Sequence, residues 1–160
     1  GYPGFAVLEP LQSARWGEIF ALALRGAADL PTREGFCVAV VISTPPFPLS
    51  RKEVDTPVGL PILIGDVEDE QIHLGEVGRE HGELVTSGLY GWTAVVTGIG
   101  TTIEEAKVAA YSGVGKVQTP NLRYRLDIGA KLVGGQLQQL TDWGWIRSMP
   151  PSRIASQMVR

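Results

Sequence analysis

The stretch over residues 92–117 constrains the fold of this chain more than any other. It opens with the apolar, β-rich run 92–97, which is typical of a strand. A Gly-Ile-Gly turn over 98–100 is expected next. Thr101 and Thr102 then each precede a Glu by three residues, which is the pattern of a capping box at a helix start. A strand followed directly by a helix is therefore predicted here.

The predicted helix should pack on a sheet, because its apolar residues fall on one stripe: Ile103, Ala106, Ala110, Val114 and Val117. Gly113 and Gly115 weaken its end, since each glycine costs roughly 1 kcal/mol relative to alanine inside a helix. Glu104 and Glu105 lie in the first turn. Their position explains them as a cap and a partner of the helix dipole rather than as an acid/base pair.

The rest of the chain indicates short strands and one further helix. Residues 11–25 have helical spacing of apolar side chains, and Gly26 stands where such a helix would end. Residues 36–42 predict a strand buried on both faces, and shorter strands are expected at 62–64, 71–74 and 83–86. Strands and helices do not alternate regularly. This pattern predicts an α+β fold with a mainly antiparallel sheet and packed helices.

Composition and charge exclude several classes of protein. The 160 residues are 44% hydrophobic, which is typical of a soluble globular domain. A net charge of −3 without a basic cluster argues against a nucleic-acid partner. No apolar run reaches the roughly 20 residues that span a bilayer, so no membrane partner is expected. A single cysteine and the lack of a signal-peptide pattern favour a cytoplasmic location.

The single cysteine and the two histidines are expected to have structural rather than catalytic roles. Cys37 lies inside an apolar strand and is expected to be a small buried hydrophobe. His73 and His81 are expected at the surface or in turns, and their surroundings offer no metal spacing, so neither a metal site nor a catalytic residue is predicted. Trp143 and Trp145 fit either an interdomain or homodimer contact or packing under the tail.

One block carries a resemblance to a known family. Over residues 92–129 a strand, a Gly turn, a T-x-E-E-A helix start, a Tyr-bearing helix and a YR-x-DIG close follow in order. This order resembles the carboxy-terminal domain of glycinamide ribonucleotide synthetase (phosphoribosylamine–glycine ligase), an ATP-grasp ligase. The resemblance implies that residues 1–34 are the end of an ATP-grasp domain with its last helix, 35–149 the carboxy-terminal domain and 150–160 a flexible tail.

The chain departs from the family pattern in three places. Residues 43–48 read Ser-Thr-Pro-Pro-Phe-Pro where the family has Ser-Gly-Gly-Tyr-Pro, which exchanges flexible glycines for prolines. Tyr90-Gly91 replaces a Gly-Gly pair, and residues 1–4 lack the two acids of Gly-Asp-Pro-Glu. These exchanges leave the substrate open.

The resemblance also implies an activity. The parent protein would be an ATP-dependent carboxylate–amine ligase of purine biosynthesis that uses ATP and Mg²⁺, and this chain would help to close its substrate cleft. The chain begins at Gly1 without Met, so we expect a fragment that binds no cofactor itself and is inactive alone. Its expected partners are the rest of its own ATP-grasp chain and small-molecule substrates.

Arg123, Arg125 and Asp127 are the predicted substrate-binding residues, with Gly129 holding the turn that follows. Arginine suits two-point recognition of a phosphate or carboxylate. The alternative is an Arg–Asp pair that fixes a strand to its neighbour, and charges on a short strand are more often structural or solvated. Two other functions stay open: a non-catalytic binding or assembly module of a diverged paralogue, and an ATP-grasp ligase with a different substrate.

Overall fold

The computed structural model describes residues 3–48, 58–66 and 71–146. The chain divides into two compact units, Gly1–Gly129 and Ala130–Arg160. In the described ranges no helix combines the length and the apolar character needed to cross a membrane. The domain boundaries inferred from the resemblance stay predictions, and the tail expected at 150–160 lies outside the described residues.

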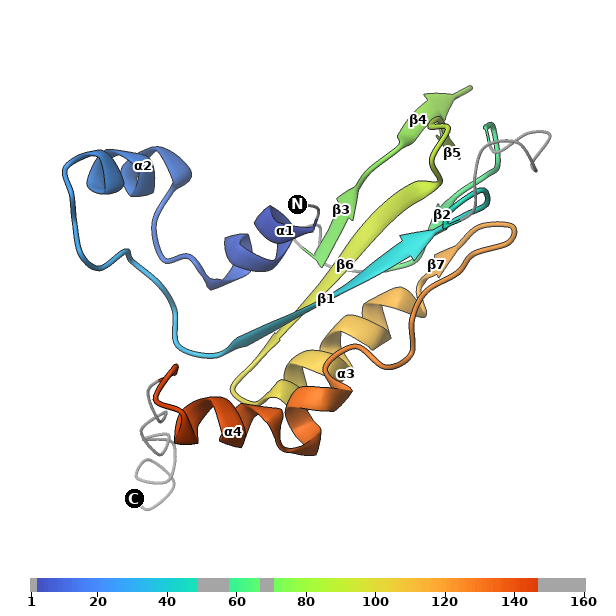
Figure 1. Ribbon diagram of the computed structural model, residues 1–160. Coiled ribbons are helices and arrows are strands. Elements are labelled where there is room, and N and C mark those ends of the chain that lie inside the picture. Colours follow the sequence, from blue (N-terminus) through green and yellow to red (C-terminus); the bar gives the residue numbers. More distant parts are fainter. Residues whose placement is uncertain (1–2, 49–57, 67–70, 147–160) are drawn as a thin grey trace, which may run out of the picture. The chain divides into compact units, whose positions relative to one another are not determined.

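A three-stranded antiparallel sheet forms the centre of the first unit (Figure 1). Its order is β1 (Phe36–Ser43), β6 (Trp92–Gly100) and β3 (Ile72–Leu74), so the longest strand lies in the middle. The predicted α+β fold with a mainly antiparallel sheet is confirmed.

The register of β1 against β6 separates two faces of this sheet. Val38 lies opposite Gly98, and the next pairs on the same face are Val40 with Val96 and Ile42 with Ala94. Residues directly opposite each other in an antiparallel pair share a face. All six are buried, so this face forms the core of the unit.

Helix α3 (Ile103–Val114) covers the buried face. Four members of the predicted stripe are buried, namely Ile103, Ala106, Ala110 and Val114. The helix ends at Val114, so the fifth member, Val117, belongs to a following strand and not to the helix. The capping box is confirmed: Thr102 Oγ1 accepts from the Glu105 amide at 3.1 Å, and the Glu105 carboxylate accepts from the Thr101 and Thr102 amides.

The turn predicted at 98–100 is wrong, because β6 continues through Gly100. Both glycines instead let α3 approach the strand closely. A Cβ at Gly98 would stand 2.2 Å from the Ala110 nitrogen, and one at Gly100 would stand 2.5 Å from the Ala106 nitrogen. Backbone atoms cannot move aside as a flexible side chain can, so these glycines are required by packing.

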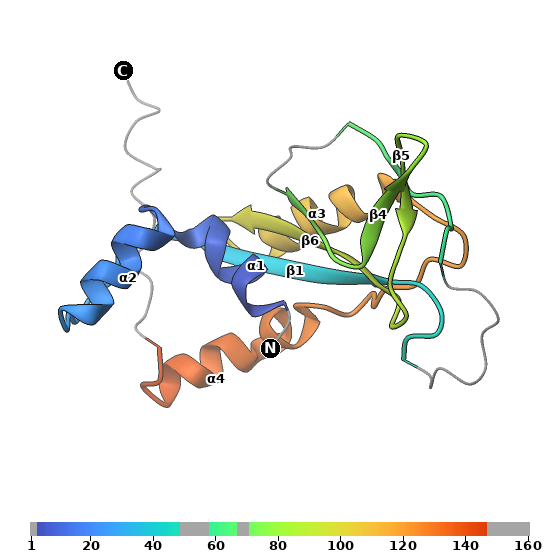
Figure 2. The same ribbon diagram turned by 90° about the horizontal axis from the view of Figure 1, so that it is seen from above.

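The opposite face of the sheet is covered by α1 (Gly4–Leu8) and the short helix η1 (Glu9–Leu11), which pack on β1 and β6 (Figures 1 and 2). The helix predicted over 11–25 therefore starts later than expected, as α2 (Trp16–Leu24). Between η1 and α2 the chain bends at Ser13 and Ala14, and Gln12 forms a β-bridge with Thr32. The Glu18 carboxylate then accepts from the Arg15 amide and starts α2.

The predicted stop at Gly26 is confirmed. Gly26 has a φ of +73°, and the Ala27 amide donates to the Leu22 carbonyl while the Gly26 amide donates to the Ala23 carbonyl. This pair of bonds is the Schellman motif, in which a glycine takes the left-handed conformation after the helix.

Two small antiparallel pairs complete the first unit. β2 (Leu63–Ile64) pairs with β7 (Val117–Gln118), and β4 (Val77–Glu80) pairs with β5 (Glu83–Thr86) in a hairpin. The strands expected at 62–64, 71–74 and 83–86 are thus present.

The second unit contains a π-helical turn, η4 (Leu132–Gln136), and α4 (Leu137–Asp142). Gly135 has a φ of +118° and kinks the chain within η4. Trp143 and Trp145 follow with ring centroids 6.3 Å apart, and they are 60% and 78% exposed. Neither side chain is therefore packed under a covering layer of the described residues.

Candidate functional site

The segment 123–129, which holds the predicted substrate-binding residues, is tied to the end of β1. The Ser43 amide donates to the Arg123 carbonyl at 2.9 Å, and the Arg123 amide donates to the Ser43 carbonyl at 2.8 Å. The Ser43 hydroxyl adds a third bond to the same Arg123 carbonyl at 3.3 Å. The main chain of Arg123 is thus fixed to the central sheet.

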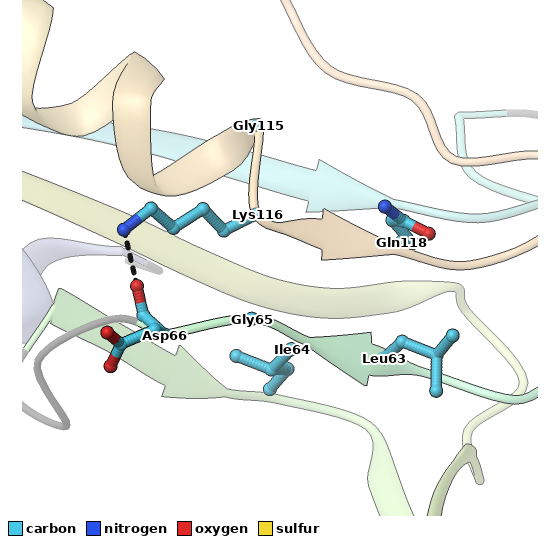
Figure 3. A pocket seen from close by; sticks show the side chains of 7 residues that line it. All are labelled: Leu63, Ile64, Gly65, Asp66, Gly115, Lys116 and Gln118. Atoms are coloured by element: carbon cyan, nitrogen blue, oxygen red, sulfur yellow. Dashed lines mark hydrogen bonds between the residues drawn. The ribbon is translucent and has the colours of Figure 1, made fainter.

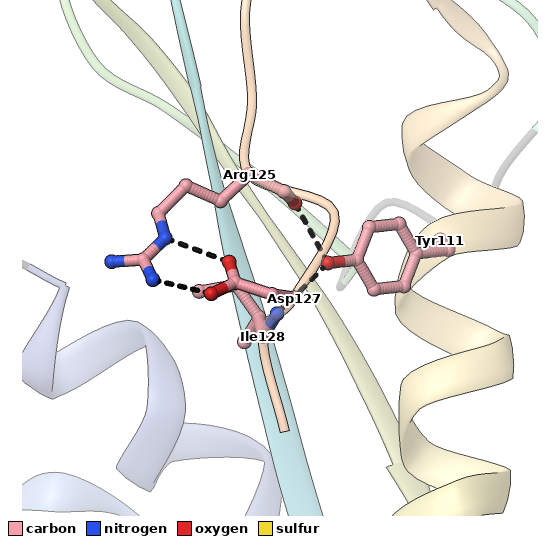
Figure 4. A network of polar contacts seen from close by, with 4 residues as sticks. All are labelled: Tyr111, Arg125, Asp127 and Ile128. Carbon is pink, nitrogen blue, oxygen red and sulfur yellow. Dashed lines mark hydrogen bonds and ion pairs between the residues drawn. The ribbon is translucent and has the colours of Figure 1, made fainter. Parts of the chain in front are cut away.

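A second anchor comes from helix α3 (Figure 4). The Tyr111 hydroxyl donates to the Arg125 carbonyl at 2.7 Å and accepts from the Ile128 amide at 3.2 Å. One phenol therefore closes the segment on both sides of Asp127. The segment is held by the sheet at one end and by the helix at the other.

Arg125 and Asp127 form a two-point ion pair within this segment. Arg125 Nε donates to Asp127 Oδ1 at 2.8 Å and Nη2 donates to Oδ2 at 2.6 Å, which is the parallel arrangement that suits guanidinium and carboxylate. The bonds and charge of Asp127 raise the pKa of the Arg125 guanidinium. Both side chains are exposed, at 72% and 57%, so the pair itself adds little stability.

The Nη1 group of Arg125 takes no part in the pair with Asp127. Asp127 uses only Nε and Nη2, so the remaining side of the guanidinium can meet an anionic ligand while the pair stays intact. Both partners belong to one segment. What connects this segment to its neighbours is the main chain of Arg123 and the hydroxyl of Tyr111, not the ion pair.

The Arg123 side chain lies apart from that pair. Its Nη1 donates to the Phe47 carbonyl at 3.4 Å, so it reaches toward the proline-rich turn after β1. Gly129 has a φ of +82°, and a Cβ there would find ordinary space, 3.6 Å from Ile103 Cγ2. Backbone conformation, and not crowding, is what favours glycine there. The structure thus joins Arg125 with Asp127 and places Arg123 separately.

The two internal departures from the family pattern meet at one end of the sheet. The Thr44 amide donates to the Gly91 carbonyl at 2.9 Å, and a Cβ at Gly91 would stand 2.0 Å from the Thr44 oxygen. Phe47 and Trp92 have ring centroids 6.1 Å apart in an edge-to-face arrangement. Two segments about 45 residues apart in sequence therefore form one surface.

Sequence reasoning missed Glu76, which organises this surface. Its Oε2 accepts from three consecutive amides, those of Tyr90, Gly91 and Trp92, at 3.0, 2.8 and 3.3 Å. Gly88 admits the side chain, because a Cβ there would stand 2.0 Å from Glu76 Cδ. Glutamate among glycines in a loop is a weak signal, since the three bonds depend on the folded path of the chain.

A shallow groove of about 500 Å³ lies where β2 pairs with β7 (Figure 3). The ammonium of Lys116 donates to the Asp66 carbonyl across it. Its lining is Leu63, Ile64, Gly65, Asp66, Gly115, Lys116 and Gln118. The groove is open and contains none of the predicted site residues.

The remaining reactive groups behave as their positions suggest. Burial raises the pKa of the Cys37 thiol, which favours the unreactive protonated form. The Thr101 hydroxyl and amide lower the pKa of Glu105, as expected for a cap. His73 Nε2 lies 3.4 Å from Thr97 Oγ1, and His81 occupies the hairpin turn with a φ of +50°. Over 3–48, 58–66 and 71–146, no group of three or more His, Cys, Asp or Glu side chains could hold a metal ion.

Comparison with known proteins points to one family. No family model matches the chain. Phosphoribosylamine–glycine ligase of Mycobacterium tuberculosis (strain H37Rv) is 28% identical over 135 residues, covering 82% of this chain and 30% of that enzyme. The same enzyme of Halalkalibacterium halodurans is 36% identical over 107 residues, covering 66% of this chain and 23% of the enzyme.

A solved structure agrees. The crystal structure of phosphoribosylamine–glycine ligase from Thermotoga maritima superposes with a TM-score of 0.65 at 29% sequence identity, covering 79% of this chain and 30% of that one. The chain spans at most about three tenths of the length of these relatives. In sequence and in fold, this chain is similar to the carboxy-terminal domain of phosphoribosylamine–glycine ligase.

Proposed function

We propose that the chain is the carboxy-terminal domain of an ATP-dependent carboxylate–amine ligase of the phosphoribosylamine–glycine ligase type. In the parent protein this domain closes one side of the substrate cleft. The named relatives support this proposal, and the covered share of their length fits one domain of a longer enzyme. Its partners would be the rest of its own chain and small-molecule substrates, in the cytoplasm.

The chemistry assigned to this domain is recognition of an anion. Such a ligase activates a carboxylate with the γ-phosphoryl group of ATP, and an amine then displaces the phosphate, so negative charge must be held in place. Arg125 binds and orients an anionic group of the substrate through Nη1, and Asp127 orients the guanidinium. Arg123 offers a second cation beside Phe47.

ATP and Mg²⁺ would be held elsewhere in the parent protein. The described residues contain no group of three or more His, Cys, Asp or Glu side chains that could hold a metal ion. When bound, the metal would neutralise the phosphoryl oxygens of the nucleotide. The role left to this domain is to fix the substrate and to exclude water from the cleft.

The anchoring of an exposed ion pair is the observation that carries the proposal. Exposed Arg–Asp pairs commonly contribute little to stability, yet here both flanks of the pair are bonded to the sheet and to α3. A guanidinium held in place before binding loses less side-chain freedom when an anion arrives. This arrangement suits a binding residue.

Arg125→Ala in the complete protein tests the proposal. Losing a charge-assisted contact of about 1.5–3 kcal/mol should raise the KM of one anionic substrate about tenfold or more, with kcat nearly retained. Arg79→Ala is the matched control, because Arg79 is also exposed and, within the described residues, its guanidinium donates to the Gly82 carbonyl of its own hairpin. Unchanged kcat/KM for every substrate in the Arg125 variant would refute the proposed contact.

The second candidate function is a non-catalytic binding or assembly module. Exposed aromatic side chains favour it, above all Trp143 and Trp145, and a homodimer is one form it could take. Reading the gene upstream of Gly1 separates the two: an acidic residue and an asparagine for metal, with a glycine-rich nucleotide loop, support the ligase. Apolar residues at those positions support the module.

A ligase with a different substrate is the third candidate. The two exchanged segments that meet at Thr44 and Gly91 place aromatic and proline side chains together at one sheet end. Offering the complete protein ATP with a panel of acids and amines, and identifying the products by mass spectrometry, distinguishes this candidate from the first.

A further inference from the structure

The hydroxyl of Tyr111 connects helix α3 to the main chain on both sides of Asp127 (Figure 4). We propose that Tyr111 is a positioning residue: it holds the main chain on both sides of Asp127 and thereby sets the place of the Arg125 guanidinium, without touching substrate. This inference rests on the proposed function of that guanidinium as an anion-binding group.

The Tyr111 hydroxyl makes two hydrogen bonds to the main chain. It donates to the Arg125 carbonyl at 2.7 Å and accepts from the Ile128 amide at 3.2 Å. These two main-chain groups flank Asp127, whose carboxylate in turn holds the guanidinium at 2.6 and 2.8 Å. The position of the guanidinium is therefore set by a continuous series of bonds that begins on α3.

Helix α3 is a rigid starting point for that series. Its stripe of four buried residues packs on the central sheet, and the capping box at Thr102 and Glu105 fixes its first turn. Tyr111 lies on this helix beyond the cap, and its hydroxyl reaches the loop. The loop thus takes its position from the core of the unit and not from its own exposed side chains.

The ring and the hydroxyl of Tyr111 make separable contributions. The ring packs beside Tyr124 with centroids 6.3 Å apart, and phenylalanine would keep that contact. Phenylalanine would lose both hydrogen bonds and leave the part-buried Ile128 amide without its acceptor. Tyr111→Phe therefore loosens the loop while the packing of α3 is preserved.

Small displacements of a binding group have large effects on rate. A guanidinium that is about 1 Å out of place can cost up to about a hundredfold in kcat/KM. Because the contact with an anionic substrate would be made before and during reaction alike, its loosening should appear in KM rather than in kcat. A purely structural role would instead lower the melting temperature and the active fraction, with KM unchanged.

The test is a double-mutant cycle in the complete protein with Tyr111→Phe, Arg125→Ala and both together. Tyr111→Phe should raise the KM of the same substrate as Arg125→Ala, on the order of tenfold, with kcat nearly retained. The double variant should be no worse than Arg125→Ala alone, because the hydroxyl acts only through that guanidinium. Hydrogen exchange at the Ile128 amide should become faster in Tyr111→Phe.

Tyr124→Phe is the control, since it removes a neighbouring hydroxyl that makes no hydrogen bond within the described residues, and it should leave KM unchanged. If Arg125→Ala raises KM but Tyr111→Phe does not, the positioning role is refuted while the proposed function stands. Additive losses in the double variant would also refute it. If Arg125→Ala itself leaves KM unchanged, the proposed function of Arg125 is refuted, and the positioning role of Tyr111 with it. Faster exchange at the Ile128 amide would then show only that its hydrogen bond to Tyr111 is structural.

Discussion

Single carboxylates set the path of the chain in two separate places. Glu76 gathers the amides of residues 90–92, and Glu105 gathers those of Thr101 and Thr102 at the start of α3. Each carboxylate accepts hydrogen bonds from several consecutive main-chain amides at once. The starts of β6 and of α3 are thus each fixed by a glutamate.

Glu105→Gln should make the stability of the domain less dependent on pH. Bonds from Thr101 lower the pKa of Glu105 below its ordinary value of about 4.5. A carboxylate with a lowered pKa stabilises the fold above its unfolded-state pKa, and that contribution is lost as pH falls through the folded-state value. The Glu105→Gln protein should therefore have a lower melting temperature than the unsubstituted protein at neutral pH. The two melting temperatures should converge at acidic pH.

Thermal unfolding followed by circular dichroism between neutral pH and about pH 3 measures this difference. Glu104→Gln is the matched control, because it removes a first-turn charge that makes no such amide bonds within the described residues. The capping role of Glu105 would be contradicted if the loss in melting temperature of Glu105→Gln stayed constant with pH. An equal pH dependence in both variants would also contradict it.

The last residues of β6 pack closely against helix α3, and two glycines make this packing possible. Gly98 and Gly100 lie opposite Ala110 and Ala106 of α3, and side chains there would overlap the helix backbone. The strand can continue to the very start of the helix only because these positions lack a Cβ.

Gly98→Ala should destabilise the domain by about 3 kcal/mol or more, because its Cβ would meet rigid backbone atoms of α3 at 2.2 and 2.4 Å. Urea unfolding provides the measurement. Gly17→Ala in α2 is the control: nothing lies within 4 Å of its Cβ position, so it should be neutral or slightly stabilising. If Gly98→Ala lowered the free energy of unfolding by less than about 1 kcal/mol, α3 would have to shift easily, and close packing would not require glycine at this position.

Local patterns predicted the elements whose causes are local. The capping box and the apolar stripe gave α3, and Gly26 gave the end of α2, because spacing within one helix determines these features. The role of Gly98 could not be predicted, since glycine serves both turns and close packing and only the position of α3 decides between them. The start of α2 was likewise missed because it depends on the bridge between Gln12 and Thr32.

The candidate site also combines a feature with a local cause and features that depend on the tertiary fold. Arg125 and Asp127 are two residues apart and carry opposite charges, so their pairing could be expected from the sequence. The separation of Arg123 from them, and the anchoring by Tyr111, depend on how α3 and β1 meet. Those contacts follow from the tertiary fold and leave no mark in the spacing of residues.

At the scale of the whole molecule, the first 34 residues leave large apolar side chains uncovered. Phe5, Phe20 and Leu24 are 69%, 53% and 89% exposed, and Trp16 links the two phenylalanines by ring contacts. Exposed apolar surface of this kind is typical of interaction sites, and we propose that it contacts another part of a longer protein. The relatives, which are more than three times as long as the matched segment, are consistent with such a contact.

Leu24→Ser should affect the isolated chain and the parent protein differently. In the 160-residue chain, where Leu24 is exposed, the free energy of unfolding should change by no more than about 0.5 kcal/mol. In the proposed parent protein, burial of Leu24 against another part of the chain should make the loss about 1–3 kcal/mol. Differential scanning calorimetry of both proteins measures this, with Val108→Ser on the exposed side of α3 as a control for small effects in each. Equal effects of Leu24→Ser in both contexts would argue against a domain contact there.

The proposed function is that of a phosphoribosylamine–glycine ligase. Mass spectrometry of the products that the complete protein forms from ATP, Mg²⁺, glycine and phosphoribosylamine tests it. We expect ATP-dependent formation of glycinamide ribonucleotide together with ADP and phosphate, and slower formation by Arg125→Ala at limiting substrate. Absence of any ATP-dependent product, from these substrates and from a panel of other acids and amines, would refute the proposed ligase function.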